Sequence, residues 1–115
     1  MANHGLFVGW NRPCSGRETV AVELFNSLIS FLGKQQQAGV VESFEPVFLH
    51  AHGGDLNGFV IVRGDRGKLT QLTASEEWYD LITRIMINAE GVGVIPAFLG
   101  QDIATQMTRY QRAIK

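Results

Sequence analysis

The chain has 115 residues, of which 45% are hydrophobic and 18% are charged, a composition typical of one globular domain. Ten basic and eleven acidic residues give a net charge of −1, without the basic excess that nucleic acids or anionic membranes attract. The single cysteine excludes an intrachain disulfide, and neither a signal peptide nor a bilayer-spanning run is visible, so we expect one cytoplasmic domain over residues 1–115, with no nucleic-acid or membrane partner.

The first third of the chain predicts a strand followed by a helix. The apolar run 6–10 is rich in strand formers and ends just before Pro13, where a strand ladder cannot continue. Ser15 and Glu18 have capping-box spacing, and apolar residues follow at intervals of three and four. We therefore expect a helix over about 17–38.

The middle of the chain predicts two antiparallel strands joined by a tight turn. Residues 40–52 are β-branched or aromatic at many positions, and Pro46 within them indicates an edge strand or a bend. Residues 53–58 are dense in turn formers, and 59–63 form a second compact apolar run. The pair is typical of a hairpin.

The last part predicts a short helix, a longer helix, a strand and a closing helix. The short helix is expected at 66–72, and Thr73 with Glu76 gives a second capping-box pattern before a helix over about 75–89. A strand follows in 91–98. The closing helix is amphipathic, with its apolar stripe formed by Ile103, Met107, Tyr110 and Ile114.

This order of elements predicts an α+β fold of the split βαβ type, with a four-stranded antiparallel sheet and an added C-terminal helix. Both helices between strands would cover one face of the sheet. The strands are nevertheless apolar on both faces, because Phe59 and Ile61 alternate with Val60 and Val62. We expect a second copy to cover the other face in a homodimer, or else the closing helix to fold over it within one chain.

The chain resembles the dimeric α/β barrel superfamily of ferredoxin-like domains. The resemblance is carried by the order of elements and by four segments, Phe7–Trp10 with Pro13–Glu18, the turn Gly53–Gly58, and the helix at 66–72. It implies a dimeric barrel built from ferredoxin-like domains. The superfamily includes cofactor-less monooxygenases, haem-degrading oxygenases, haem peroxidases and lactone isomerases, and this chain looks most like its uncharacterised members.

The haem-degrading branch uses an asparagine on the first strand, a tryptophan on the second helix and a later histidine. Asn11 and Trp78 are counterparts of the first two. No histidine follows the second helix, because all three lie in the first half of the chain. We therefore expect no haem or other cofactor, and we interpret Trp78 as a core residue.

His50 and His52 are the strongest candidates in the sequence for a chemically active site. They lie two residues apart on an expected strand and so project from one face, with Asp55 nearby in the turn. The three side chains could hold a metal with open positions, or one histidine oriented by Asp55 could act as a general base. The alternative is that both histidines are solvated or bonded to nearby carbonyls, and we predict no metal site.

Arg63 and Cys14 are weaker candidates. Arg63 ends an apolar strand and is expected to pair with Glu42 or Glu45 on the neighbouring strand, or to grip an acidic ligand. Cys14 lies near a helix start, where amides can lower a thiol pKa, but the sequence offers it no assigned base.

The sequence as a whole favours a small-molecule-binding protein or a cofactor-independent enzyme, monooxygenase-like or isomerase-like, with a pocket between sheet and helices. The alternative is a non-catalytic structural or interaction protein whose sheet face serves dimerisation. Catalytic residues stay unassigned. The expected lining of the pocket is Trp10, Asn11, His50, His52, Arg63 and Tyr79.

Overall fold

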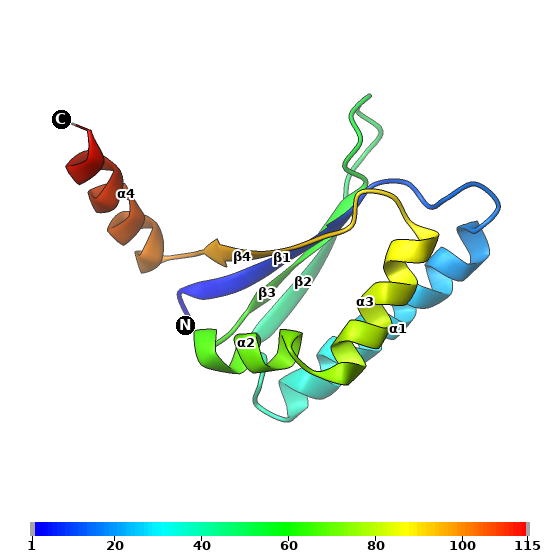
Figure 1. Cartoon of the computed structure of the whole chain (residues 1–115), viewed down its shortest axis with the longest axis horizontal. Helices are drawn as coiled ribbons and strands as arrows, with labels where there is room; N and C mark the ends of the chain where they lie inside the picture. The colour runs from blue at the N-terminus through cyan, green and yellow to red at the C-terminus, as the bar shows by residue number, and fades with distance from the viewer. Residues whose placement is uncertain (1, 115) are drawn as a thin grey trace.

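The computed structural model describes residues 2–114 and contains a four-stranded antiparallel sheet with helices packed on one face (Figure 1). Its order of strands and helices confirms the α+β fold predicted above, with the short helix counted separately. In chain order the elements are β1 (His4–Trp10), α1 (Glu18–Gln37), β2 (Ser43–Phe48), β3 (Gly58–Arg63), α2 (Arg66–Thr73), α3 (Glu76–Asn88), β4 (Gly93–Phe98) and α4 (Gln101–Ala113).

The strands lie in the order β2-β3-β1-β4, and every neighbouring pair is antiparallel. Both edge strands contain a proline, Pro46 in β2 and Pro96 in β4. Proline lacks the N–H that a central strand would donate, so its presence is tolerated at an edge. The prediction that Pro46 marks an edge strand is confirmed.

The core lies between one face of the sheet and the helices α1, α2 and α3. Leu6 and Val8 of β1 oppose Val62 and Val60 of β3 in register, and all four side chains are buried. The helices supply the other side of the core, and Trp78 of α3 packs there at 3% exposure, as interpreted from the sequence. The buried apolar helix residues are Leu24, Leu28, Phe31, Leu32, Leu69, Leu72, Trp78 and Leu81.

Both capping-box predictions were wrong in detail. Arg17 occupies the N-cap of α1 without a side-chain hydrogen bond, and its backbone N–H closes a turn onto Cys14 O at 2.9 Å. Ser75 caps α3 by accepting from Trp78 N–H at 3.2 Å. Thr73 instead ends α2, where its hydroxyl donates to the carbonyl of Leu69 at 3.1 Å.

Strand β2 is shorter than the expected range 40–52. Its pairing with β3 ends where Phe48 opposes Gly58. Beyond it, Leu49 N–H donates to Asn57 O and Asn57 N–H donates to Trp10 O, at 3.0 and 2.9 Å. These bonds close the base of a loop, so the following residues leave the sheet.

The second face of the sheet is largely apolar, with Glu45 beside Ile61, and within residues 2–114 no layer covers it. Phe7 stacks on Phe59 with ring centroids 5.0 Å apart, and Ile61 and Val47 lie beside them on the same face. Ile95 of β4 belongs to this face and is 53% exposed. We call this surface, made of Phe7, Val47, Phe59, Ile61 and Ile95, the open face.

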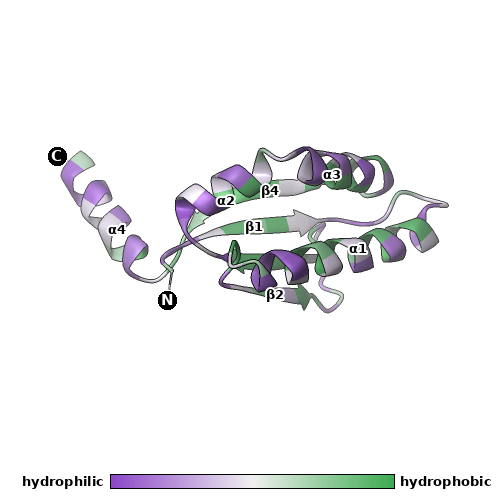
Figure 2. Cartoon of the chain, turned by 90° about the horizontal axis from the view of Figure 1, so that it is seen from below, coloured by the Kyte–Doolittle hydropathy of each residue, from purple (hydrophilic) through white to green (hydrophobic). Residues whose placement is uncertain are grey.

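The closing helix does not cover the open face. α4 leaves the end of β4 and extends away from the rest of the domain (Figures 1 and 2). None of its described residues is buried. The expectation that α4 folds over the sheet within one chain is therefore wrong. Within residues 2–114, no helix has both the length and the apolar character needed to cross a membrane.

Replacing Leu32 by alanine tests the core. Its side chain is fully buried between α1 and the sheet, so Leu32→Ala is expected to lower the free energy of unfolding by about 2–5 kcal/mol. Ile87→Ala is the matched control, because Ile87 is 61% exposed, and it should change stability by roughly 0.5 kcal/mol or less. Urea denaturation of both variants measures the difference, and equal losses would contradict this core.

Candidate functional site

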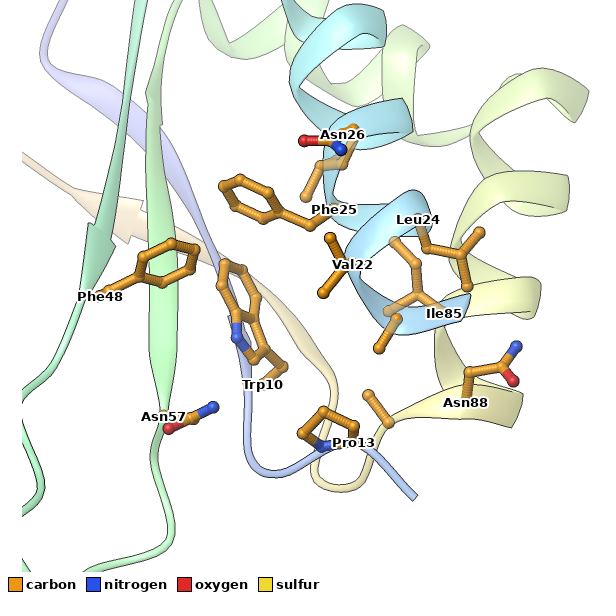
Figure 3. A pocket seen from close by; sticks show the side chains of 13 residues that line it. Trp10, Pro13, Val22, Leu24, Phe25, Asn26, Phe48, Asn57, Ile85 and Asn88 are labelled. Carbon is orange, nitrogen blue, oxygen red and sulfur yellow. The ribbon is translucent and has the colours of Figure 1, made fainter. Parts of the chain in front are cut away.

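A cavity of about 440 Å³ lies where the ends of β1 and β2 meet helices α1 and α3 (Figure 3). It is bounded by the sheet on one side and by the helices on the other. Its lining residues are Trp10, Pro13, Ala21, Val22, Leu24, Phe25, Asn26, Leu28, Phe48, Asn57, Ile85, Asn88 and Ala89.

Three aromatic rings form one wall of the cavity. Phe25 lies 5.0 Å from Phe48 and 5.9 Å from Trp10 between ring centroids, and Trp10 meets Phe48 edge-on at 6.3 Å. Figure 3 shows the three rings converging from α1, β1 and β2. Phe48 is 65% exposed, which places an aromatic surface at the mouth of the cavity.

Gly58 makes this aromatic wall possible. Trp10 and Phe48 both oppose Gly58 in the sheet, one from each neighbouring strand. A Cβ atom at residue 58 would lie 2.9 Å from the indole of Trp10 and 2.8 Å from the carbonyl oxygen of Val47. The missing side chain therefore leaves room for the two rings to approach each other across the middle strand.

Asn88 supplies a buried polar group to the cavity. Its side chain is 7% exposed, its Oδ1 accepts from Arg17 Nη1 at 3.0 Å, and its Nδ2 donates to the carbonyl of Arg84 at 2.8 Å. These two bonds fix the orientation of the amide. An amide has two N–H groups and an oxygen with two lone pairs, so one N–H and one lone pair of Asn88 are not used by these two bonds.

Two loops close the end of the cavity beside Asn88. Asn11 N–H donates to Glu90 O, Glu90 N–H donates to Arg12 O, and Cys14 N–H donates to Asn88 O, each at 2.8 Å. These bonds tie the segment after β1 to the end of α3. The cavity end is thus held by backbone hydrogen bonds rather than by side-chain packing alone.

The lining contains no ionisable side chain. Its polar groups are the indole N–H of Trp10 and the amides of Asn26, Asn57 and Asn88. A charged ligand would lose its hydration in this cavity without gaining an opposite charge, which is costly. A neutral ligand that is largely apolar fits the lining better.

The structure does not bring the six expected lining residues together. Trp10 lines the cavity, and Asn11 lies in the adjoining loop, where its backbone bonds to Glu90. Tyr79 is 53% exposed on α3. Arg63 lies at the opposite end of the sheet from Trp10, and the two histidines follow β2 into the loop beyond the sheet, so these side chains are dispersed.

His50 and His52 lie exposed in the loop between β2 and β3. Gly54 N–H donates to His52 Nδ1 at 3.2 Å, and His52 Nε2 lies 2.8 Å from the carbonyl oxygen of Leu56. Because a carbonyl can only accept, Nε2 carries the proton, and both ring nitrogens are occupied within the loop. Over residues 2–114, no three side chains from histidine, cysteine, aspartate or glutamate are grouped to hold a metal ion.

Arg63 lies at the end of β3, away from the cavity. Its Nη1 donates to the carbonyl of Ala2 at 3.4 Å, while the amide of Ala2 donates to Glu42 Oε2 at 2.6 Å. Arg63 and Glu42 thus each bond to the backbone of Ala2, whereas the sequence predicts that Arg63 pairs directly with a glutamate of the neighbouring strand. Cys14 is half-buried, and its thiol lies 3.7 Å from the carbonyl oxygen of Ile87.

Most residues of the cavity lining are absent from the sequence-based prediction. Phe25 and Phe48 belong to apolar patterns that indicate a helix and a strand and carry no separate sign of a site. Asn88 continues the helical positions of the buried Leu81 and the half-buried Ile85 at spacings of four and three. A polar residue on the apolar side of a helix was the available indication of a polar group facing the interior.

Comparison with known proteins supports the fold. No protein-family model matches the chain, and no curated protein matches its sequence. Among solved structures, a dimeric ferredoxin-like protein of unknown function from Bacteroides fragilis has a TM-score of 0.61 and 10% identity, covering 84% of this chain and 97% of that one.

Two further solved structures are described as oxygenases. SnoaB, a cofactor-independent oxygenase from Streptomyces nogalater, was solved in a mutant form that gives a TM-score of 0.57 and 14% identity, covering 86% of this chain and 93% of its own. An antibiotic biosynthesis monooxygenase gives a TM-score of 0.57 and 15% identity, covering 84% of this chain and 98% of its own. These structural similarities establish a shared ferredoxin-like fold, and at such low sequence identity they show the fold alone. They confirm the expected fold class and the resemblance at that level.

Truncating Asn88 tests the polar side of the cavity. Asn88→Ala leaves Arg17 and the carbonyl of Arg84 without their partner, so a loss of about 1–3 kcal/mol in unfolding free energy is expected. Asn26→Ala is the control, because Asn26 also lines the cavity but is exposed. Chemical denaturation monitored by circular dichroism compares the two, and a loss for Asn26→Ala as large as for Asn88→Ala would be incompatible with this geometry.

Proposed function

We propose that the chain binds a neutral, largely apolar small molecule in the cavity between the sheet and helices α1 and α3. The observation that carries this proposal is the lining, in which three aromatic rings face a space of about 440 Å³ and no side chain is ionisable. Small-molecule sites are commonly clefts of about 300–1,000 Å³ with apolar walls and a few polar groups.

The aromatic wall favours a ligand that contains a flat ring system. Trp10, Phe25 and Phe48 present ring faces and edges to the same space, and aromatic groups interact favourably in offset or edge-to-face arrangements. Asn88 can orient such a ligand through its remaining N–H and lone pair. A ligand with one carbonyl or hydroxyl group matches this combination.

A cofactor-independent enzyme, monooxygenase-like or isomerase-like, is the second candidate function. The description of SnoaB as a cofactor-independent oxygenase favours it, since the two proteins share a fold. In such a reaction the amides of Asn57 and Asn88 would orient the substrate and polarise its oxygen atoms. Proton transfer would require a group beyond the cavity lining, because that lining has no titratable side chain.

We also propose that two copies pair through their open faces. Five large apolar side chains lie on that face, and Ile95 is 53% exposed. Monomeric proteins rarely leave such a continuous apolar patch in water. The Bacteroides fragilis protein with the same fold is described as dimeric, which supports an isologous pair. If the cavity binds no small molecule, this association is the alternative role of the chain.

Narrowing the cavity tests ligand binding. Val22 is 63% exposed at the cavity wall, so Val22→Trp places a large ring in the cavity without disturbing the core. Neutral 1-aminoanthracene is the probe, and its fluorescence should rise with the wild-type chain. Its affinity should fall by about tenfold or more in Val22→Trp, which corresponds to about 1.4 kcal/mol or more of binding free energy.

Val20→Trp is the matched control, because Val20 lies on the same helix but outside the cavity lining. The affinity for 1-aminoanthracene should be unchanged in this variant. Absence of fluorescence enhancement with the wild-type chain, or equal losses in the two variants, would refute binding in this cavity.

A charge on the open face tests the pairing of two copies. Ile61 lies at the middle of β3 on that face, directly opposite Glu45 of β2, so Ile61→Glu is expected to convert a dimer into a monomer by placing two like charges side by side in the interface. Ile87→Glu makes the same change at an exposed site on α3 and should leave the dimer intact. Light scattering after size-exclusion chromatography gives both masses. A monomeric wild-type chain at high micromolar concentration would exclude the dimer.

A further inference from the structure

Helix α4 turns its apolar stripe away from its own chain. The four large apolar residues of the stripe are exposed by 52, 52, 57 and 75%, whereas the half-buried residues of the helix are the polar Asp102 and Gln106. At about 100° per residue, the stripe is rotated by roughly 90° from this polar side. The stripe consists of Ile103, Met107, Tyr110 and Ile114.

The direction of α4 is fixed by contacts at its base. Asn3 Oδ1 accepts from Gln101 N–H at 3.2 Å, and Leu99 N–H donates to Asn3 O at 3.0 Å. Gly100 has φ +51°, a conformation that favours glycine. The guanidinium of Arg109 then lies 5.7 Å from the ring centre of Phe98. These contacts direct the helix outward from the edge strand.

A helix of this length is not stable by itself. α4 has 13 residues, and isolated helices of about 12–15 residues are marginal in water unless an apolar face is packed. The described part of its own chain does not bury that face. The helix therefore requires a surface on another molecule.

We infer that the apolar stripe of α4 packs on the second copy of the chain in a sheet-to-sheet dimer, so that each subunit extends its α4 across its partner. The inference rests on the proposed pairing through the open face. In this arrangement Met107 and Tyr110 lie in the interface, while Asp102 and Arg109 keep their contacts with their own subunit.

The required interface area favours a second copy as the occupant. With the spacing of strands and residues in a sheet, the open face measures roughly 20 by 20 Å, or about 400 Å². A stable interface buries about 800 Å² on each partner. A 13-residue helix adds a strip of about 200 Å², and each subunit would gain two such strips, one on its own α4 and one beneath the partner's α4. The sheet face alone is too small, and the exchanged helices supply the remainder.

The charge of α4 argues against a membrane as the occupant. Helices that lie on membrane surfaces are rich in lysine and arginine on their polar face. The described residues of α4 include two arginines and one aspartate, and the rest of the polar face is glutamine and threonine. Such a nearly neutral polar face suits a protein interface better than an anionic lipid surface.

Paired charge substitutions in the full chain test the inference. Met107→Lys with Tyr110→Lys places two charges in the stripe, whereas Thr105→Lys with Thr108→Lys places the same charges on the exposed polar side. Sedimentation velocity over a dilution series gives the dissociation constant of the dimer. The stripe variant should raise this constant by about tenfold or more, and the control should leave it unchanged.

Photo-crosslinking gives an independent result. A benzoylphenylalanine at residue 107 should yield a covalent dimer, and mass spectrometry should map the crosslink to the partner. An unchanged dissociation constant in the stripe variant, or crosslinks confined to one chain, would overturn the role of α4. If Ile61→Glu still dissociates the dimer in that case, the sheet-to-sheet pairing stands without the helix exchange. A wild-type chain that stays monomeric would overturn both.

Discussion

The alternation of side chains along four short strands is the constraint on which the rest of this molecule depends. Each strand presents apolar residues to both sides, so both faces of the sheet need to be buried. The helices packed on the sheet cover only one of them. Helices α1, α2 and α3 pack on the first face and create the core. The part of the chain that the structure describes supplies no such layer for the second face, which connects the fold to the proposed association of two copies.

The cavity arises where this packing ends. Helix α1 and the sheet meet closely over Leu28 and Leu32. Beyond β1 and β2 the chain leaves the sheet, and the aromatic rings of Trp10, Phe25 and Phe48 border the space that remains. Gly58 permits the approach of two of these rings, and Asn88 is held in place by hydrogen bonds to Arg17 and Arg84. Local backbone requirements therefore determine the shape of the site.

Periodicity predicted the fold better than the site. The alternation of Phe59 and Ile61 with Val60 and Val62 specified the faces of β3, and the turn at 53–58 specified its pairing with β2. The cavity depends on which residues from distant segments meet, and no local pattern brings Phe25, Phe48 and Asn88 together. The spacing of His50 and His52 indicates a possible chemical site, but His52 uses both ring nitrogens inside its own loop.

The beginning of the described chain meets the base of α4 at one corner of the domain. Asn3 binds the residues at the start of α4 through both its backbone and its side chain. An affinity tag fused ahead of this residue would therefore place its mass beside the base of α4, next to the surface where a second subunit would lie. Material for biophysical work is better prepared with such a tag removed, because the tag and a second subunit would compete for the same space.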